Sequence, residues 1–500
     1  MQKLLQASVA LALAAPLGAM ADTPSEIRAL RQELEAMRSA YEARLQAMEQ
    51  RLRAAEAAAA STAQPPRPPS PAPATPAAAT SAAATSAGAP SAPVAAASVA
   101  AASVAAASVA AASVAAAPVG APPAGANAFN PALSLILSGT YTRTSQDPAR
   151  YAITGFSLPA DAEIGPGTRG LGLAESELRF SASIDPWLRG AASVALHPDD
   201  SVSVEEAWVQ TTRLGHGFSL KAGRFYSGIG YLNPKHAHTW DFVDSPLAYQ
   251  AMLGRQYGDD GVQLNWVAPT ELFVELGAEL GRGRSFPGGG DASRNGAGMR
   301  ALAAHVGGDV GDSHSWRAGL SMLDAKARDQ DLLATDPAGN PVTNAFSGDT
   351  RVWIADAIWK WAPHGDATRT SFKLQGEYLR SARDGNLVYD VGGAGSAGTY
   401  RAVQSGWYLQ GVYKFMPRWR VGLRTERLDP GTPDYGVNTA ALATPDYGPR
   451  KNSLMLDYSP SEFSRVRLQF AQDRARHGLV DNQLFLQYQM SLGAHGAHDY

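Results

Sequence analysis

Two histidines separated by one residue, His236 and His238, are followed closely by two aspartates, Asp241 and Asp244. Imidazole nitrogens and carboxylate oxygens are ligands of zinc and copper, so this stretch has the residue types of a metal site. A structural zinc site needs a third and a fourth ligand at defined geometry, which Asp241 or Asp244 would supply. An ordinary packing or lining role for the two histidines is the alternative, and the sequence leaves both interpretations open.

The segments on either side of this stretch alternate apolar and polar residues. Residues 133–141, LSLILSGTY, place Leu133 and Leu135 on one face and Ser134 and Ser138 on the other. This is the pattern of a strand with one apolar side. It recurs in sixteen segments: 133–141, 173–184, 187–196, 202–212, 218–226, 260–267, 272–280, 299–309, 315–322, 351–361, 370–379, 405–416, 419–427, 451–458, 463–472 and 483–492.

Tight turns and long connections follow each other strictly in turn along these segments. The six long connections are 143–172, 227–259, 281–298, 323–350, 380–404 and 428–449. Such alternation is typical of an outer-membrane barrel with short turns in the periplasm and long loops outside. Sixteen strands enclose an aqueous lumen, so the apolar face must point outward to outer-membrane lipid. The sequence therefore predicts an all-β fold, a 16-stranded antiparallel transmembrane β-barrel over 127–500.

The face opposite the apolar one carries charge, acidic in the earlier strands and basic in the later ones. The residues expected to line the lumen on the later strands are Lys373, Glu377, Arg420, Arg424, Arg465 and Arg467. The connection 227–259 is the third outward one, a position that resembles the constriction loop of sixteen-stranded porins. Its Asp241 and Asp244 suit that role, and Gly228 and Gly230 permit a sharp inward turn. An acidic loop opposite a basic wall would filter ions by charge, whereas the alternative is that these charges only solvate the interior.

Three segments of different composition precede the barrel. Residues 1–21 have the basic start, apolar run and small-residue cleavage site of a signal peptide. Residues 22–56 repeat apolar positions in steps of three and four, which predicts a coiled coil, with a single amphipathic helix as the alternative. Residues 57–126 are a low-complexity Ala/Pro/Ser/Val linker without the means to build a core, although its Ala-rich part could be partly helical. We expect this N-terminal region to lie in the periplasm, where the coil would trimerise the chain or contact peptidoglycan.

The amino-acid composition argues against several classes of function. The chain has no cysteine, which excludes disulfides, thiolate metal sites and cysteine catalysis. Its net charge of -3 gives no basic excess for nucleic acid. It contains no nucleophile elbow, metalloprotease helix or phosphate loop, so we do not expect an enzyme, although a hydrolase built from dispersed residues stays open. No cofactor is expected apart from zinc at His236 and His238.

Five segments carry a family resemblance: GRFYSGIGYLNPKHAHTWDFVDSPLAYQ, WKWAP, LQGEYL, GWYLQGVYKFMPRWRVGLR and LFLQYQMSLGAHGAH. They resemble a proteobacterial outer-membrane β-barrel family often labelled zinc-regulated TonB-dependent outer membrane receptor, over nearly all of 127–500. That label implies energised metal uptake through a 22-stranded barrel. The layout of a coil before sixteen strands is similar instead to the phosphate-selective and sugar porins, which are trimeric. The last strand, 483–492, with Tyr500 resembles the signature that the barrel assembly machinery recognises.

These observations predict an outer-membrane porin for passive diffusion of small hydrophilic or ionic solutes, assembled as a homotrimer, with 227–259 as its constriction. Two alternatives belong to other classes. One is a receptor for a metal or metal complex, and the other is an envelope tether whose coil contacts peptidoglycan.

Overall fold

A computed structural model describes residues 131–289, 295–336, 338, 340–442 and 446–493. The segments expected as signal peptide (1–21), coiled coil (22–56) and linker (57–126) lie outside the described residues, as does Tyr500. Where the chain is described, none of its helices is both long and apolar enough to cross a membrane.

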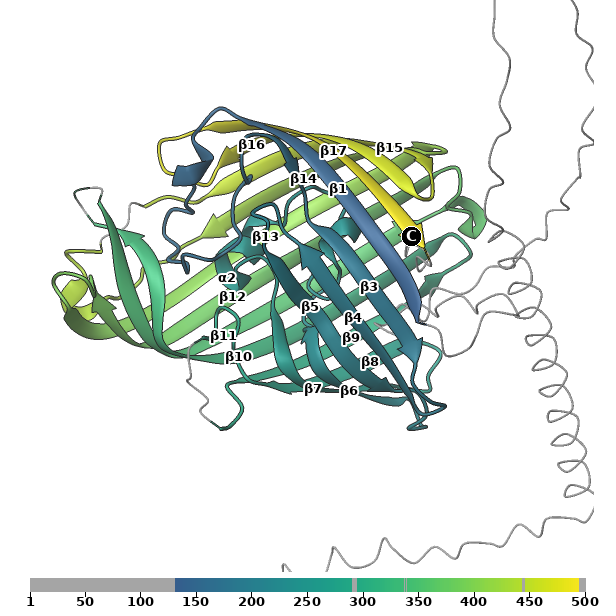
Figure 1. Ribbon diagram of the computed structural model, residues 1–500, viewed down its shortest axis with the longest axis horizontal. Coiled ribbons are helices and arrows are strands. Elements are labelled where there is room, and N and C mark those ends of the chain that lie inside the picture. Colours follow the sequence, from purple (N-terminus) through teal and green to yellow (C-terminus); the bar gives the residue numbers. More distant parts are fainter. Residues whose placement is uncertain (1–130, 290–294, 337, 339, 443–445, 494–500) are drawn as a thin grey trace, which may run out of the picture. The chain divides into compact units, whose positions relative to one another are not determined.

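The described chain forms one antiparallel sheet that closes on itself, with the last strand beside the first (Figure 1). Its strands are β1 (Ala132–Thr144), β2 (Gly170–Leu173), β3 (Ser176–Ser183), β4 (Leu188–Leu196), β5 (Val202–Thr211), β6 (Phe218–Tyr226), β7 (Gly258–Val267), β8 (Phe273–Gly281), β9 (Met299–Val310), β10 (His314–Thr335), β11 (Pro341–Trp361), β12 (Ser371–Tyr389), β13 (Ser396–Met416), β14 (Trp419–Asp429), β15 (Arg450–Ser461), β16 (Ser464–Arg474) and β17 (Asp481–Gly493). Both β2 and β3 pair with β1, so these two short strands fill one position in the wall. The barrel therefore has 16 strand positions, which confirms the predicted fold.

Sixteen positions do not match the 22 strands of a TonB-dependent receptor. The part of the family resemblance that concerns the receptor label is therefore not supported by the architecture of the described residues.

The predicted inversion of polarity is present along the wall. On β1, Leu133 is 49% exposed on the outside, while Ser138 is 3% exposed on the inside. Outward residues of β1 face outward residues of β17, as in the pair Leu135 and Leu492. A soluble protein rarely exposes a continuous apolar surface of this kind. The outer surface of the barrel is therefore suited to lipid.

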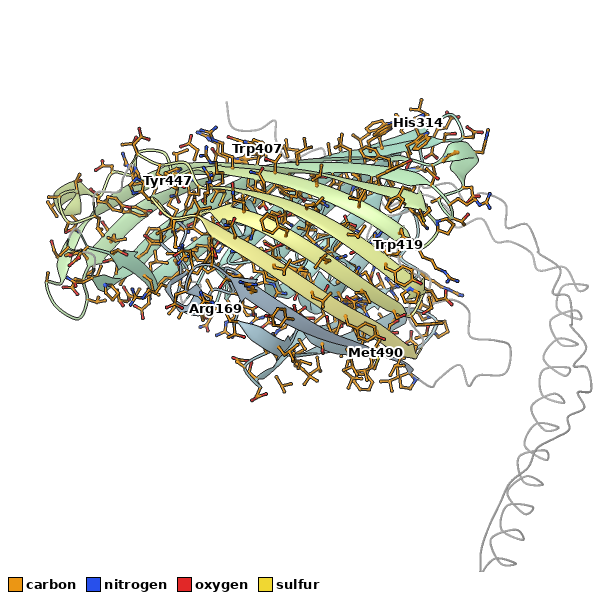
Figure 2. The ribbon with its side chains drawn as sticks, turned by 90° about the horizontal axis from the view of Figure 1, so that it is seen from above. Arg169, His314, Trp407, Trp419, Tyr447 and Met490 are labelled. Carbon is orange, nitrogen blue, oxygen red and sulfur yellow. The ribbon has the colours of Figure 1, made fainter. Side chains whose placement is uncertain are left out.

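The two ends of the barrel differ. Figure 2 shows Arg169 and Tyr447 at one end, which we call the loop end, and His314, Trp419 and Met490 toward the other, which we call the turn end. Connections at the turn end are mostly tight, as between β13 and β14, where two residues separate the strands.

The expected pattern of connections is wrong in two respects. First, 323–350 and 380–404 are mostly strand, because β10 and β11 continue for 22 and 21 residues and β12 and β13 for 19 and 21. A membrane-crossing strand needs only about 9–11 residues, so these two hairpins extend beyond the bilayer. Second, 197–201 and 475–480 are short although they lie at the loop end, so long and short connections do not strictly alternate.

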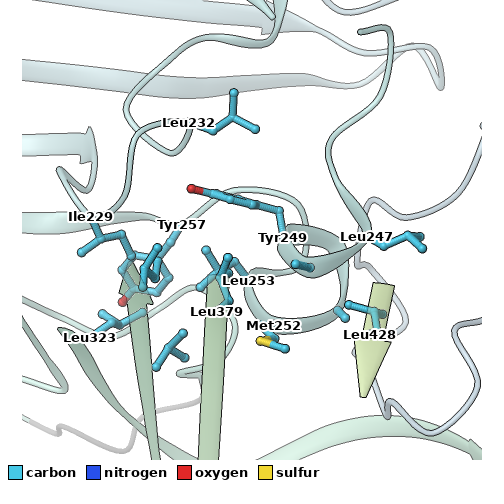
Figure 3. Close-up of a cluster of buried hydrophobic side chains, with 14 of the residues drawn as sticks. Ile229, Leu232, Leu247, Tyr249, Met252, Leu253, Tyr257, Leu323, Leu379 and Leu428 are labelled. Atoms are coloured by element: carbon cyan, nitrogen blue, oxygen red, sulfur yellow. The ribbon is translucent and has the colours of Figure 1, made fainter. Parts of the chain in front are cut away.

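Part of the lumen is filled by the chain itself. The one α-helix of the described residues, α2 (Leu247–Leu253), has every side chain buried. It belongs to a cluster of buried apolar residues that includes Leu323 of β10, Leu379 of β12 and Leu428 of β14 (Figure 3). The remaining helical turns are short 3-10 segments: η1 (Pro148–Arg150), η2 (Ala237–Thr239), η3 (Pro363–Gly365) and η4 (Gly436–Asn438).

Candidate functional site: a loop folded into the barrel

The connection between β6 and β7, residues 227–257, is the third at the loop end, and we call it loop 3. It turns inward at Gly230, whose φ of +65° favours glycine. A Cβ atom there would lie 2.5 Å from Oε2 of Glu377, so any side chain would collide with the wall. Gly228, also expected to permit the turn, has no left-handed backbone, and its N–H donates to Oε1 of Glu279 at 2.8 Å.

Glu377, expected as a lumen-lining residue, is the acceptor that holds the first part of loop 3. Its carboxylate accepts from the backbone N–H groups of Tyr231 at 3.1 Å and Leu232 at 3.0 Å. It also accepts from the hydroxyls of Tyr249 at 2.8 Å and Tyr408 at 2.5 Å. Burial, followed by the nearby Glu377 carboxylate, raises the pKa of Tyr249 well above its usual value. Tyr249 therefore stays a hydrogen-bond donor.

The two aspartates of loop 3 contact the basic wall directly. Asp241 lies 2.5 Å from Nζ of Lys373 and 3.4 Å from Nη1 of Arg420. Asp244 lies 2.6 Å from Nζ of Lys451 and 2.8 Å from Nη2 of Arg424. The expected acidic loop and basic wall are thus joined by ion pairs, where the sequence suggested a field across open water.

These pairs decide the protonation of the aspartates. Burial alone would raise the pKa of Asp241, but Lys373 and Arg420 outweigh it and hold that pKa below its usual value. Burial likewise opposes ionisation of Asp244, whose pKa is nevertheless held far below its usual value by Lys451 and Arg424. Both carboxylates are therefore charged at neutral pH.

The last two expected wall residues belong to the same network. Arg467 donates from Nε to Oδ1 of Asp457 at 2.7 Å. Arg465 donates from Nη2 to the backbone carbonyl of His238 at 3.0 Å and to Oε1 of Gln489 at 2.7 Å. Lys451 and Asp457 of this network are not among the residues predicted from the sequence, although alternation along β15 places both side chains inward.

The histidines of loop 3 lie against the opposite, acidic part of the wall. Nδ1 of His236 is 3.1 Å from Oε2 of Glu177 and 3.3 Å from Oε2 of Glu205. Its Nε2 is 3.0 Å from Oε2 of Glu206. Nδ1 of His238 is 3.0 Å from the same Oε2 of Glu177. The expectation that Asp241 or Asp244 completes a set of ligands is wrong, because both aspartates are engaged by the basic wall.

Glu205 reaches this cluster because β5 has a β-bulge. Ser193 of β4 is opposite Glu206, and the next pair is Val194 with Val204, so Glu205 has no partner residue. A bulge of this kind re-aims a side chain relative to simple alternation. Both Glu205 and Glu206 therefore point toward His236. Alternation along the sequence assigns only one of two neighbouring residues to the lumen, which is why this pair was missed.

The three glutamates around His236 determine the charge of its imidazole. Burial favours the neutral imidazole, but Glu177, Glu205 and Glu206 outweigh burial and hold the pKa of His236 well above its usual value. Arg179 is also near, with its Nη1 3.3 Å from Nε2 of His236 and 3.9 Å from Glu206.

A second group of similar composition consists of Glu163, Glu175 and His197. Here a guanidinium already contacts the carboxylates. Arg255 of loop 3 forms ion pairs with Glu163 and, at 2.5 Å, with Glu175.

Comparison with solved structures finds outer-membrane barrels at low sequence identity. OmpT of Vibrio cholerae is 11% identical, with 73% of this chain and 98% of that chain covered and a TM-score of 0.44. The channel DcaP of Acinetobacter baumannii is 13% identical, with coverage of 72% and 96% and a TM-score of 0.42. The anion-selective porin from Comamonas acidovorans is 12% identical, with coverage of 73% and 99% and a TM-score of 0.43.

No family model matches the chain. The sequence is 31% identical over 399 residues to an uncharacterized protein of Aquifex aeolicus, and the match covers 75% of this chain and 80% of that protein. The chain therefore belongs to the same protein family as this Aquifex aeolicus protein.

Proposed function

We propose that the protein is an outer-membrane channel for passive, non-enzymatic diffusion of small hydrophilic or ionic solutes, with loop 3 as its constriction. The observation that carries this proposal is the attachment of loop 3 to inward side chains on two sides of the barrel. Glu177 and Glu206 contact it from β3 and β5, whereas Lys373 and Arg424 contact it from β12 and β14. A loop held in this way narrows the lumen at the level of charged groups.

Two of the cations at the constriction keep part of their surface in contact with solvent. The side chains of Lys373 and Arg420 are 26% and 24% exposed, whereas Arg424 and Arg467 are nearly completely buried. Solutes that pass loop 3 therefore contact the charges of Lys373 and Arg420 rather than those of the buried arginines. We infer a preference for anions over cations, with Arg424, Arg465 and Arg467 holding the loop and the wall in place.

Planar-bilayer recording with the purified full chain tests both the channel activity and the preference for anions. We expect discrete conductance steps and a reversal potential that indicates anion preference under a salt gradient. The double substitution Lys373→Gln and Arg420→Gln should move the reversal potential toward that of a cation-preferring channel. Arg401→Gln is the matched control, since its side chain is 75% exposed on the β13 extension and should not matter. A membrane preparation without conductance steps would refute the channel, and unchanged selectivity would refute the role of the two cations.

We further infer that the barrels assemble as a homotrimer. Support comes from the edge between β5 and β6, where pairing ends at Ala207 and Arg224, so that residues 202–206 of β5 have no partner on β6. An unpaired strand edge needs cover, which a neighbouring copy of the barrel would supply at the loop-end border of the apolar band. Native mass spectrometry in detergent should give three copies of the chain, and a monomer in gently solubilised membranes would contradict this.

A further inference from the structure

Beside η2, a group of buried polar atoms of the wall and of loop 3 makes no hydrogen bond of good geometry. These atoms are Oε1 and Oε2 of Glu177, Oε2 of Glu205 and Nδ1 of His236. Glu177 is 3% exposed and His236 is 8% exposed. Buried polar atoms nearly always have hydrogen-bond partners, whereas these have only ion-pair contacts with the imidazoles, which require a protonated ring. These atoms belong to ligand types, carboxylate and imidazole, that bind divalent transition metals.

The four side chains at this place converge from three parts of the chain. Oε2 of Glu177, from β3, is 3.1 Å from Nδ1 of His236 and 3.0 Å from Nδ1 of His238. Oε2 of Glu205, from the bulge of β5, is 3.3 Å from Nδ1 of His236. One ligand atom each from Glu177, His236 and His238 lies within 4.8 Å of the others. Two ligand atoms that each lie about 2.0–2.2 Å from one zinc ion are at most about 4.4 Å apart. The contacts of Glu177 with the two histidines are well within this limit.

The backbone of loop 3 fixes the two imidazoles relative to each other. His236 directly precedes the 3-10 turn η2 and His238 lies within it, and the two rings are 5.7 Å apart. Oγ1 of Thr239 donates to the carbonyl of His236 at 2.7 Å, which closes the turn. Nε1 of Trp240 donates to the carbonyl of Lys235 at 2.9 Å. The ligand positions are therefore set before any ion arrives.

Glu206 completes an arrangement that is common behind metal-bound histidines. It contacts Nε2 of His236, on the side of the ring away from Glu177 and Glu205. A carboxylate that accepts from one ring nitrogen leaves the lone pair of the other for a metal and orients the ring. A divalent cation that binds here takes the place of an imidazole proton, so its charge offsets that of the surrounding carboxylates, which suits a buried position.

The neighbouring group Glu163, Glu175 and His197 supplies an internal contrast. It has the same residue types, yet Arg255 pairs with both of its carboxylates. A cation from the protein thus fills the place that a metal would take. At Glu177 and Glu205 the orphaned oxygens have no such guanidinium within hydrogen-bond geometry.

We propose that Glu177, His236 and His238, with Glu205 beside His236, form a binding site for one divalent transition-metal ion, of which Zn²⁺ is the natural probe. The bound ion fastens loop 3 to the β3–β5 side of the lumen, opposite the ion pairs of Asp241 and Asp244. Loop 3 is then held at both sides of the barrel.

Calorimetric titration with Zn²⁺ tests the site directly and does not depend on conductance. The full chain, without a polyhistidine tag and stripped by chelator, should bind one tight equivalent. The double substitution His236→Ala and His238→Ala should lower the affinity at least about 100-fold. His197→Ala is the matched control and should leave the affinity unchanged, because that histidine belongs to the group that Arg255 fills.

Glu177→Gln is a second test, which keeps the proposal falsifiable if the double histidine variant fails to fold. It keeps the shape of the side chain, and we expect it to lower the affinity at least about 10-fold while the barrel keeps its heat-modifiable mobility on gels. The proposal is overturned if the wild-type chain binds Zn²⁺ no more tightly than the double variant. It is equally overturned if Glu177→Gln changes nothing, or if His197→Ala causes the loss.

Discussion

Asp244 joins loop 3 to three side chains of the basic wall. Its carboxylate is shared by Lys451, Arg424 and Nε2 of Gln469, at 2.6, 2.8 and 2.8 Å. All of these groups are buried, so the cost of their desolvation is offset only while the charges stay paired. Arg424 and Lys451 each keep a second carboxylate nearby, Glu426 at 2.7 Å and Asp473 at 3.4 Å. Asp244 therefore matters more for docking loop 3 than for neutralising the wall.

Replacement of Asp244 by Asn should release loop 3 without unfolding the barrel. Loss of one partner of a buried ion pair typically costs about 3–5 kcal/mol, and the second carboxylates reduce that figure here. We expect faster proteolysis within 227–257 and noisier single-channel current. Asp312→Asn is the control, because its side chain is 72% exposed in a turn-end connection. Equal proteolysis of the two variants would show that Asp244 does not hold the loop.

Acid should release loop 3 through the same two aspartates. The pKa values of Asp241 and Asp244 are lower in the docked loop than the usual value of 3.8. A carboxylate with a depressed pKa stabilises docking above its ordinary pKa, and this contribution is lost as the pH falls further. Conductance recorded from pH 6 to pH 3 should therefore change only below about pH 4. The double variant Asp241→Asn and Asp244→Asn should lack that step, and a step that persists in it would contradict the assignment.

At the scale of elements, the strands were predictable because each one lies between lipid and water. Alternation along β1 and β17 reports this directly, as Leu133 and Leu492 face outward while Ser134 and Gln489 face inward. The inward position of Lys373 or Arg424 follows from the same parity. The sequence also indicated that loop 3 folds inward, through Gly230 and the two aspartates.

Other features depend on pairing between distant segments, which alternation does not report. The bulge at Glu205 is set by the register of β5 on β4, so the carboxylates around His236 could not be derived from β5 alone. Residues 323–335 belong to β10 because they pair with 341–352 of β11, outside the membrane band where no apolar face is required. The partner of Tyr249 is Glu377, 128 residues away.

Deletion of 235–245 tests loop 3 as an element. The segment carries both aspartates and both histidines, so its loss removes the attachment to the two sides of the lumen. We expect a larger single-channel conductance with the barrel still folded. Deletion of 392–395 is the control, because this exposed tip between β12 and β13 lies outside the lumen and should leave conductance unchanged. Equal or lower conductance after the first deletion would mean that loop 3 does not limit the path.

At the scale of the whole molecule, the outer surface divides into an apolar band and a charged border. Cross-strand pairs of opposite charge lie on the loop-end side of the band: Arg224 with Asp260, Arg300 with Asp324, Asp324 with Arg351, and Asp384 with Arg401. From Asp324 toward the turn end, the outward residues of β10 include Met322, Leu320 and Trp316. The border therefore marks the height at which the barrel leaves the hydrocarbon, and the hairpins β10–β11 and β12–β13 continue past it.

Two substitutions on the same strand separate this band from the extension. Leu320 and Leu333 of β10 are 53% and 45% exposed, but only Leu320 lies within the band. An arginine facing lipid near the bilayer midplane costs about 2–4 kcal/mol, and the cost falls to about 0–1 kcal/mol at the interface. Leu320→Arg should therefore lower the free energy of unfolding from liposomes by about that larger amount, while Leu333→Arg should change it little. Denaturant titrations in lipid measure the difference, and equal effects would mean that the hydrocarbon does not surround β10 where the apolar band places it.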